Sequence, residues 1–213
     1  MLISIPYFFL DDNQDKKKHL VIFQLLILTV LVELIGKYMG VNKQNNSLIY
    51  NVGYVIIGLS LIFYFFSLVF HEKNVKRWVF FLWVLFICWE VINVLYFQSI
   101  FNVFHHYTLA FGGSIIIGLC FYYFFGIFYK NWYSEKSLLA VPEFWIISFL
   151  MFFYSASLLY FLSFNFFFEK MDIELFIKLN FLIQILGATM YFIMGLAFYA
   201  PLIFKGKNEI NIS

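Results

Sequence analysis

Long runs of apolar side chains, separated by short polar links, dominate the pattern along this chain of 213 residues. An α-helix of about 20 apolar residues crosses the roughly 30 Å hydrocarbon layer of a bilayer, because each residue adds about 1.5 Å of length. These runs predict an all-α fold, a polytopic integral membrane bundle of six transmembrane helices that forms one domain over residues 1–213. The six runs are 19–39, 48–70, 78–97, 107–129, 139–162 and 175–204.

Strands do not fit these runs. Strands of an outer-membrane barrel alternate polar and apolar positions, and the runs show no such alternation. Helices are the remaining way to satisfy every backbone group in lipid. The composition agrees, because 63% of residues are hydrophobic, 24% are aromatic and only 12% are charged. An ordinary soluble domain has about 25% charged residues.

The basic residues indicate how the bundle is oriented. By the positive-inside rule, the side richer in Lys and Arg is cytoplasmic, and an even number of helices puts both termini there. Residues 1–18 are then a cytoplasmic or interfacial segment, and residues 205–213 a cytoplasmic tail, of a protein in the bacterial inner membrane. We expect the apolar helices to contact membrane lipid. Because the net charge is only +2, we expect no binding of nucleic acid. Ten of the fourteen basic residues lie on the amino-terminal side: Lys16, Lys17, Lys18, Lys73, Lys76, Arg77, Lys130, Lys136, Lys205 and Lys207.

Glu90 is the polar residue that stands out within the apolar runs. It lies twelve residues after Trp78, close to the middle of its predicted helix, with no basic residue of that helix within reach. The apolar residues of this helix favour insertion by about 4 to 8 kcal/mol, and one central charge opposes it by about 2.5 to 3.5 kcal/mol. The helix still inserts, with Glu90 turned away from lipid. Asn93 and Trp83 share its face of the helix, and Gln98 follows near the exit.

Two interpretations of Glu90 remain open from the sequence. In the structural interpretation, Glu90 is protonated and donates a hydrogen bond to Asn93 or to a polar residue of a neighbouring helix. This bond helps to hold the helices together. Intramembrane carboxyl groups also form ligand, ion or proton sites. Glu90, Asn93, Trp83 and Gln98 are therefore the candidate intramembrane polar site.

The other polar residues near the helix ends have structural explanations. Glu33 and Lys37 are four residues apart on one predicted helix, so an ion pair is expected between them. Glu143 follows Pro142 at a helix start, where a carboxylate meets the positive end of the helix dipole. His105 and His106 fall at the outer end of the fourth helix, where an interfacial position is expected.

No catalytic or cofactor motif accompanies these residues. The sequence contains no His-Glu-x-x-His, Gly-x-Ser-x-Gly or P-loop pattern, so we expect neither an enzyme nor a metal or cofactor site. No run carries a glycine or proline break at its middle, which argues against a secondary transporter. Small residues recur at helical spacing, as in Ser114 and Gly118, and favour close helix packing within the chain or in a homo-oligomer.

Four stretches together carry a resemblance to a known family. They read VELIGKYMG (32–40), NNSLIYNVGYVI (45–56), EVINVLYFQSIFNVFHHYTLAFGGSIIIGLCFYYF (90–124) and PEFWIISFLMFFYSASLLYF (142–161). The chain resembles an uncharacterised family of bacterial multi-pass membrane proteins, similar to the membrane-embedded sensory region found before some histidine kinases. That family begins with an extra helix, of which residues 1–10 would be a remnant, and any signal would pass to a separate protein.

The resemblance implies a module for sensing or for partner binding. Its polar markers include an outer-face cluster, which could bind a small polar ligand or cap helix ends. We therefore expect a non-enzymatic inner-membrane sensory or partner-docking module that passes a signal to a separate protein. The alternative is an oligomeric pore or channel, an accessory protein of a bacterial defence system such as an RNA-targeting CRISPR system. The outer-face cluster comprises Glu33, Asn45, Asn46, Tyr50 and Asn51.

Overall fold

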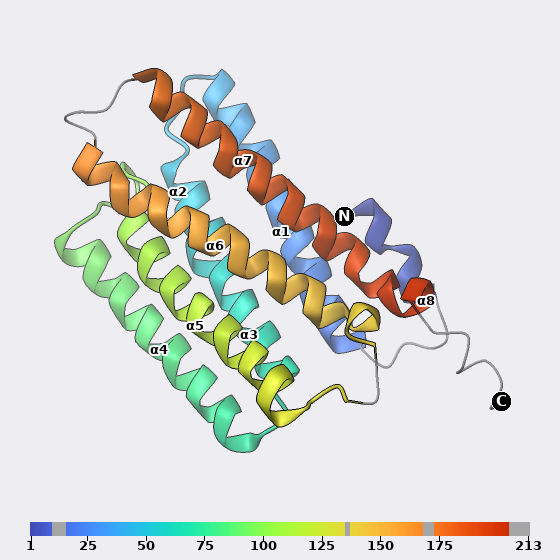
Figure 1. The fold of residues 1–213 in the computed structure, drawn as a ribbon. Helices are drawn as coiled ribbons and strands as arrows, with labels where there is room; N and C mark the ends of the chain where they lie inside the picture. The colour runs from blue at the N-terminus through green and yellow to red at the C-terminus, as the bar shows by residue number, and fades with distance from the viewer. Residues whose placement is uncertain (10–15, 135–136, 168–172, 205–213) are drawn as a thin grey trace.

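The computed structural model describes residues 1–9, 16–134, 137–167 and 173–204, and in these residues the regular structure is helical. Six helices are long and apolar enough to cross a membrane, as the sequence predicts (Figure 1). They are α1 (Lys16–Val41), α2 (Ser47–Tyr50) continuing through η3 (Asn51–Gly58) into α3 (Leu59–Val69), α4 (Lys73–Tyr96), α5 (His106–Lys130), α6 (Pro142–Phe167), and α7 (Ile173–Leu196) continuing through η5 (Ala197–Tyr199) into α8 (Ala200–Phe204).

The start of α4 lies before its predicted boundary. Hydropathy places the start at residue 78, but the helix begins at Lys73 because lysine and arginine are good helix formers and prolong it into the polar region. Glu90 lies six residues before the last residue of α4, Tyr96. At 1.5 Å per residue this is about 9 Å from the end of α4.

Two of the six spans are not regular α-helices, although the sequence suggests unbroken ones. In the second span, η3 is a π-helix that contains Gly53 and Gly58. Glycine is a weak helix former, so it lowers the cost of this distortion. The last span tightens into the 3-10 turn η5 just before Pro201. Proline has no N–H to donate to the carbonyl four residues earlier, so the α-helical pattern is interrupted there.

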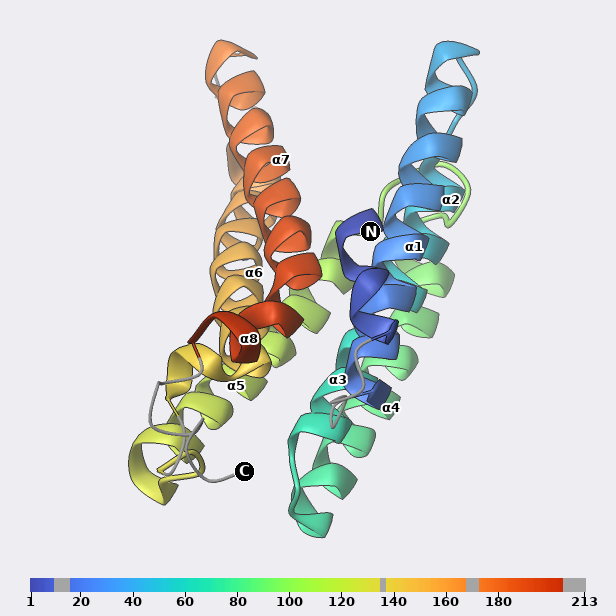
Figure 2. The same cartoon turned by 90° about the vertical axis from the view of Figure 1, so that its right-hand side faces the viewer.

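The spans form two layers that α5 connects. In Figure 2, α1, α3 and α4 lie on one side and α6 and α7 on the other, while α5 crosses from the first group to the second. Contacts follow this order, with α3 against α1 and α4, α5 against α4 and α6, and α7 against α6 and α1. We call the end with connections 42–46 and 97–105 the distal end, and the end with residues 1–9 and 70–72 the proximal end.

Glycines allow the closest contacts between the spans. A Cβ atom on Gly112 of α5 would lie 2.8 Å from Leu59 of α3 and 2.9 Å from Phe86 of α4. A Cβ atom on Gly53 would lie 2.2 Å from Val32 of α1. Lipid tails are as apolar as these side chains, so close packing rather than burial from water holds such helices together. These glycines keep α5 close to α3 and α4, and η3 close to α1.

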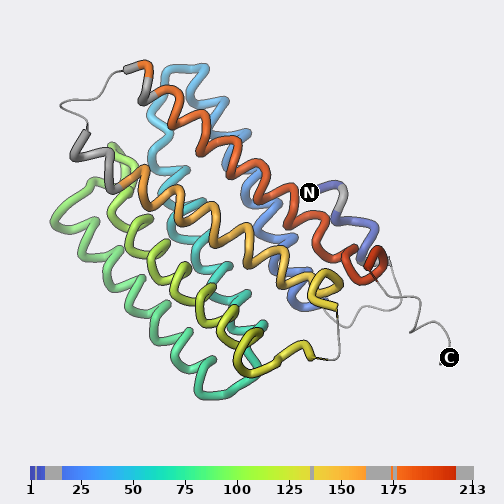
Figure 3. The backbone as a smooth tube through the Cα atoms, viewed as in Figure 1, coloured from blue at the N-terminus to red at the C-terminus, as the bar shows by residue number. Residues whose placement is uncertain are grey.

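Residues 1–9 pack onto the bundle at the proximal end. The sequence suggests an interfacial segment, but Ser4 and Tyr7 are buried between α1 and the last span. The Ser4 hydroxyl lies 2.7 Å from His19 Nε2, and the Tyr7 ring contacts His19 and Phe198 at centroid distances of 4.5 and 5.4 Å. The backbone tube in Figure 3 shows this segment alongside α7.

Candidate functional site

Buried polar side chains concentrate at the distal end, where the connection between α4 and α5 folds back onto the bundle. They come from η3, from the last two turns of α4, from residues 97–105 and from the first turn of α5. In an apolar span every such group needs a partner, because an unpaired polar group in a nonpolar environment costs several kcal/mol. We call this set the distal polar site: Asn51, Glu90, Asn93, Gln98, His105 and Thr108.

The centre of the distal polar site is a contact between a carboxyl group and an imidazole. His105 Nδ1 lies 2.8 Å from Glu90 Oε1, and the two residues are 0% and 4% exposed. One proton shared between these two atoms completes the hydrogen bond. A carboxyl group on one ring nitrogen orients the imidazole and directs the other nitrogen, Nε2, away from it. Glu90 therefore faces the protein interior, and its main partner is a histidine from the next segment.

Asn51 holds the connection in the conformation that brings His105 to Glu90. Its amide nitrogen donates to the carbonyl oxygens of Ile100 and Val103, at 3.0 and 2.8 Å. Its side-chain oxygen accepts a hydrogen bond from the backbone N–H of His105 at 2.8 Å. Three main-chain groups of the connection are thus satisfied by one side chain at the start of the π-helix.

A second chain of hydrogen bonds runs beside the first. Asn93 Nδ2 donates to Gln98 Oε1 at 3.2 Å, and that oxygen also accepts the backbone N–H of Tyr107 at 3.3 Å. Gln98 Nε2 donates to the Phe104 carbonyl at 3.2 Å and lies 2.8 Å from His106 Nδ1. The Tyr107 N–H and the Phe104 carbonyl fix which end of the Gln98 amide is the oxygen. They therefore also fix the orientation of Asn93, which donates to that oxygen.

Four buried atoms of the distal polar site have no hydrogen-bond partner among the described residues. They are Glu90 Oε2, Asn93 Oδ1, His105 Nε2 and Thr108 Oγ1. A buried polar atom without a partner costs about 1 to 3 kcal/mol, so these four atoms have bonding capacity that a water molecule or a ligand can satisfy. In the described part of the chain no group of three His, Cys, Asp or Glu residues is arranged to hold a metal ion.

The predicted outer-face cluster separates into three groups. Glu33 accepts a hydrogen bond from the Tyr54 hydroxyl at 2.6 Å, and the Tyr50 and Tyr54 rings stack at 5.6 Å. No ion pair joins Glu33 to Lys37, although both are described residues. Asn51 belongs instead to the distal polar site.

The two other asparagines of that cluster bind backbone carbonyls near the connections. Asn46 Nδ2 donates to the Gly36 carbonyl at 3.2 Å, and Asn45 Nδ2 donates to the Asn102 carbonyl at 3.4 Å. Asn45 Oδ1 also accepts the Ser47 backbone N–H at 2.8 Å, at the start of α2. These contacts are of the helix-capping and turn-stabilising type.

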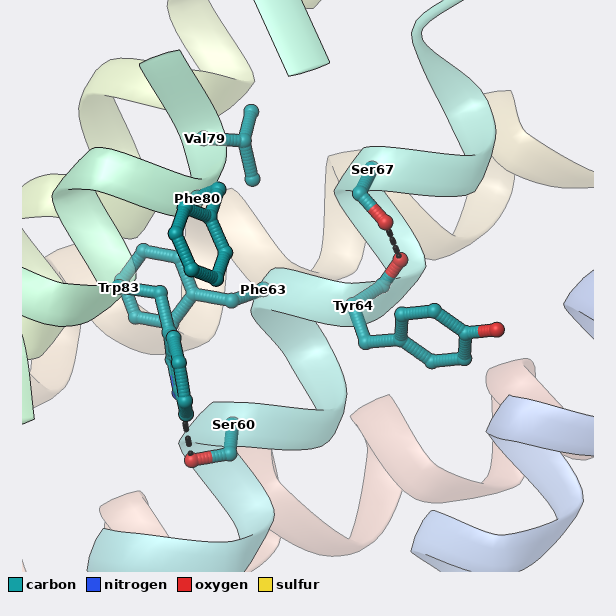
Figure 4. Close-up of a pocket in the computed structure, with 7 residues that line it drawn as sticks. All are labelled: Ser60, Phe63, Tyr64, Ser67, Val79, Phe80 and Trp83. Atoms are coloured by element: carbon teal, nitrogen blue, oxygen red, sulfur yellow. Dashed lines mark hydrogen bonds between the residues drawn. The ribbon is translucent and has the colours of Figure 1, made fainter. Parts of the chain in front are cut away.

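Trp83 lies where α4 packs against α3 beside Ser60, a contact that we call the α3–α4 seam. No hydrogen bond or ring contact joins Trp83 to the described residues of the distal polar site. Its indole N–H donates to the Ser60 hydroxyl at 3.0 Å (Figure 4). Together with Phe63, Phe80 and other residues it lines a cavity of about 280 Å³ that is almost entirely apolar. The cavity therefore carries no chemistry comparable to that of Glu90.

The sequence analysis did not name Thr108, and it expected His105 at an interfacial position, whereas His105 is buried against Glu90. Both depend on the path of residues 97–105, which hydropathy treats as a simple link outside the span. One signal was available in the sequence: the connection carries Gln98 and two adjacent histidines close to an intramembrane carboxyl group. Asn51 was found as a polar marker but was assigned to the wrong neighbours.

Comparison of the chain with models of protein families, with functionally described proteins and with solved structures finds no match. The function proposed below therefore follows from the chemistry of the distal polar site.

Proposed function

We propose that the chain is a non-enzymatic sensory module of the bacterial inner membrane, which detects a change at its distal end and passes it to a separate protein. The observation that carries this proposal is the buried Glu90–His105 pair with its unpartnered atoms. The basic residues on the proximal side support an orientation in which the distal end faces outward.

The hydrogen bonds supply a route from the site to the rest of the bundle. A change in the protonation or ligation of Glu90 and His105 alters the contact that docks the connection onto α4. Asn51 links the same connection to η3, and η3 packs against α1 at Val32. A π-helical segment often marks a functional position, and η3 can return to regular helix by shifting one residue. Movement of the connection would thus reach three spans.

The alternative function, an oligomeric pore, has less support from the packing. Gly112 and Gly113 of α5 and Gly187 of α7 face Phe86, Tyr154 and Phe153 of the same chain. These small residues are used for packing within one chain. The pair Ser114 and Gly118 of α5 is exposed instead, and a Cβ atom placed on Gly118 would have no neighbour within 4 Å.

The sensory proposal is tested with a fluorescent reporter on the connection. Phe101 is 63% exposed, so Phe101→Cys accepts an environment-sensitive dye once Cys88 and Cys120 are replaced by alanine. In nanodiscs, dye emission should change in a sigmoidal manner between acidic and alkaline pH. Glu90→Gln keeps the shape of the side chain but cannot exchange a proton, so it should abolish the change.

The matched control is Glu33→Gln, which removes a carboxyl group of the same distal half that contacts Tyr54 and not the distal polar site. It should leave the emission change intact. His106 and Tyr107 are the other titratable groups beside the site, and His106→Asn separates their contribution. An emission change that persists unaltered in Glu90→Gln would refute the sensory role of this pair.

A further inference from the structure

The cavity at the α3–α4 seam opens to the outer surface of the bundle. Phe63 and Val79 are each 2% exposed and form its inner side, whereas Tyr64 and Phe80 are 52% and 63% exposed. Figure 4 shows Phe80 and Trp83 of α4 beside Phe63 of α3. The cavity volume of about 280 Å³ is close to the lower limit of about 300 Å³ for small-molecule sites. A slender molecule can therefore enter from outside the bundle.

The polar groups around this cavity already have partners within the two helices. The Trp83 N–H donates to the Ser60 hydroxyl at 3.0 Å, and the Ser67 hydroxyl donates to the Tyr64 carbonyl at 2.7 Å. The Tyr64 hydroxyl lies on the side away from Trp83 and Phe80 (Figure 4). A polar ligand would lose its hydrogen bonds on entering such a cavity, whereas a hydrocarbon chain has none to lose. The cavity therefore suits an acyl chain.

Basic side chains continue the same face of α4 toward its proximal end. Arg77 and Lys76 lie three and four residues before Phe80, at spacings that place side chains over one another on a helix. Four residues span about 6 Å, so Lys76 lies about one turn beyond the cavity. Lys73 lies almost one turn further, and all three basic residues are exposed. Trp78 beside them is 65% exposed, as is typical of the level of the lipid headgroups.

The charge of these basic side chains is not compensated within the described part of the chain. No ion pair joins Lys73, Lys76 or Arg77 to another described residue. Glu72 is the one acidic residue in the sequence between 71 and 89, and it pairs with Lys130 of α5 at 2.9 Å. Arginine and lysine both bind phosphate, and basic pockets between membrane helices bind anionic headgroups. An apolar cavity that leads to such a group matches both parts of an anionic lipid.

We propose that the α3–α4 seam binds an anionic phospholipid, with one acyl chain in the cavity and the phosphate group at Lys76 and Arg77. Lys73 adds attraction at longer range. Because the lipid contacts both α3 and α4, its binding stabilises their packing at the proximal end. The lipid site lies apart from the distal polar site and does not depend on the proposed sensory function.

The test follows the fluorescence of Trp83 in nanodiscs of phosphatidylcholine. Phosphatidylglycerol or phosphatidylcholine with brominated acyl chains is added as a minor component, because bromine quenches an indole that it contacts. Phosphatidylglycerol should quench Trp83 at much lower fractions than phosphatidylcholine. Lys76→Gln and Arg77→Gln should each reduce this preference about fivefold. Phenylalanine replaces the other tryptophans, so that Trp83 alone emits: Trp78, Trp89, Trp132 and Trp145.

Matched controls separate the charge of the site from its cavity. The double variant Lys16→Gln with Lys17→Gln removes exposed charges at the same end of the bundle but from α1, so the preference should persist. Ser67→Leu fills the cavity and keeps every charge, so it should abolish the preference. Ser114→Leu places the same side chain at an exposed serine of α5 and should have no effect.

A second measurement covers the case in which the protein with a single tryptophan folds poorly. Native mass spectrometry of the chain with all its tryptophans should then show retained phosphatidylglycerol, and less of it in Lys76→Gln. Equal quenching by the two lipids, or an equal loss of preference in the α1 and α4 variants, would overturn the site, since the basic residues would then act only as general surface charge. If neither lipid quenched Trp83, another protein surface such as a second copy would cover the seam, and the lipid site would be wrong.

Discussion

Two buried carboxyl groups, one at each end of the bundle, differ in how completely they are satisfied. Glu143 at the proximal end is 3% exposed, lies in the first turn of α6 and forms an ion pair with Lys18 of α1. Glu90 at the distal end is 4% exposed and meets an imidazole instead of a lysine. No buried side-chain oxygen of Glu143 lacks a partner among the described residues, whereas Glu90 Oε2 does.

Burial alone therefore does not show which of the two carboxyl groups has bonding capacity left over. Glu143 has a full counter-charge and the favourable end of a helix dipole, so its environment leaves nothing for a ligand to supply. Glu90 has an imidazole as its partner, and three other side chains beside it also carry a buried atom without a partner among the described residues. The unsatisfied bonding capacity at the distal polar site is the physical basis of the function that we propose for it.

The largest effect should come from breaking the proximal pair. Lys18→Met leaves Glu143 buried without its counter-charge, which should destabilise the protein by about 3 to 5 kcal/mol. Thermal unfolding in detergent measures this loss. The double variant Lys18→Met with Glu143→Leu removes both charges and should recover most of the stability, because apolar residues of similar volume replace a buried pair at little cost.

Lys178→Met is the matched control for that measurement. Lys178 pairs with Glu174 on α7, and their side chains are 69% and 72% exposed. Exposed pairs contribute less than about 1 kcal/mol, so this variant should unfold almost as the unaltered protein does. An equal loss in Lys18→Met and Lys178→Met would show that the proximal pair is not a buried structural element.

An intermediate effect is expected at the residue that positions the distal pair. Asn51→Leu removes three hydrogen bonds to residues 97–105, each worth about 1 kcal/mol net, so a loss of roughly 3 kcal/mol is expected. Amide hydrogen exchange in the connection should quicken at the same time, because His105 loses its backbone anchor. The Phe101 reporter should lose its pH response while α6 and α7 stay protected.

Asn45→Ala provides the comparison at a neighbouring exposed asparagine of the predicted outer-face cluster. Its side chain makes one long contact, 3.4 Å to the Asn102 carbonyl, and a local bond to Ser47. An exposed substitution of this kind usually changes stability by no more than about 0.5 kcal/mol. If Asn45→Ala disturbed the connection as much as Asn51→Leu, the special role of Asn51 would be wrong.

The sequence predicts the six spans and the unusual position of Glu90, but not the contacts of Glu90. Hydropathy detects spans because the energetic preference for apolar residues accumulates over some 20 positions. The contact of Glu90 with His105 depends on how nine residues of an irregular connection fold, and three hydrogen bonds from Asn51 decide that path. Asn51 belongs to another span, so no local pattern reveals the pairing.

The pair at Glu143 illustrates the same limit. Its place in the first turn of α6 follows from Pro142 before it, which is a local signal. Its partner Lys18 is 125 residues away in sequence and meets it only through the packing of the bundle. The π-helix η3 also had no clear sequence signal beyond its two glycines.

The smallest effect is expected at Trp83, which the sequence groups with Glu90 and which the structure places at the α3–α4 seam. Ser60→Ala leaves the buried part of the Trp83 indole without its acceptor and should destabilise the protein by about 1 kcal/mol. Ser67→Ala removes only a bond to the Tyr64 carbonyl within the same helix and should cost less than about 0.5 kcal/mol. Neither variant should alter the pH response of the Phe101 reporter, because the seam shares no hydrogen bond with the described residues of the distal polar site. If Ser60→Ala abolished the pH response of the reporter, the proposed site would have to include Trp83. The contrast would then fail between Trp83, whose N–H has a partner, and the distal polar site, which has atoms without one.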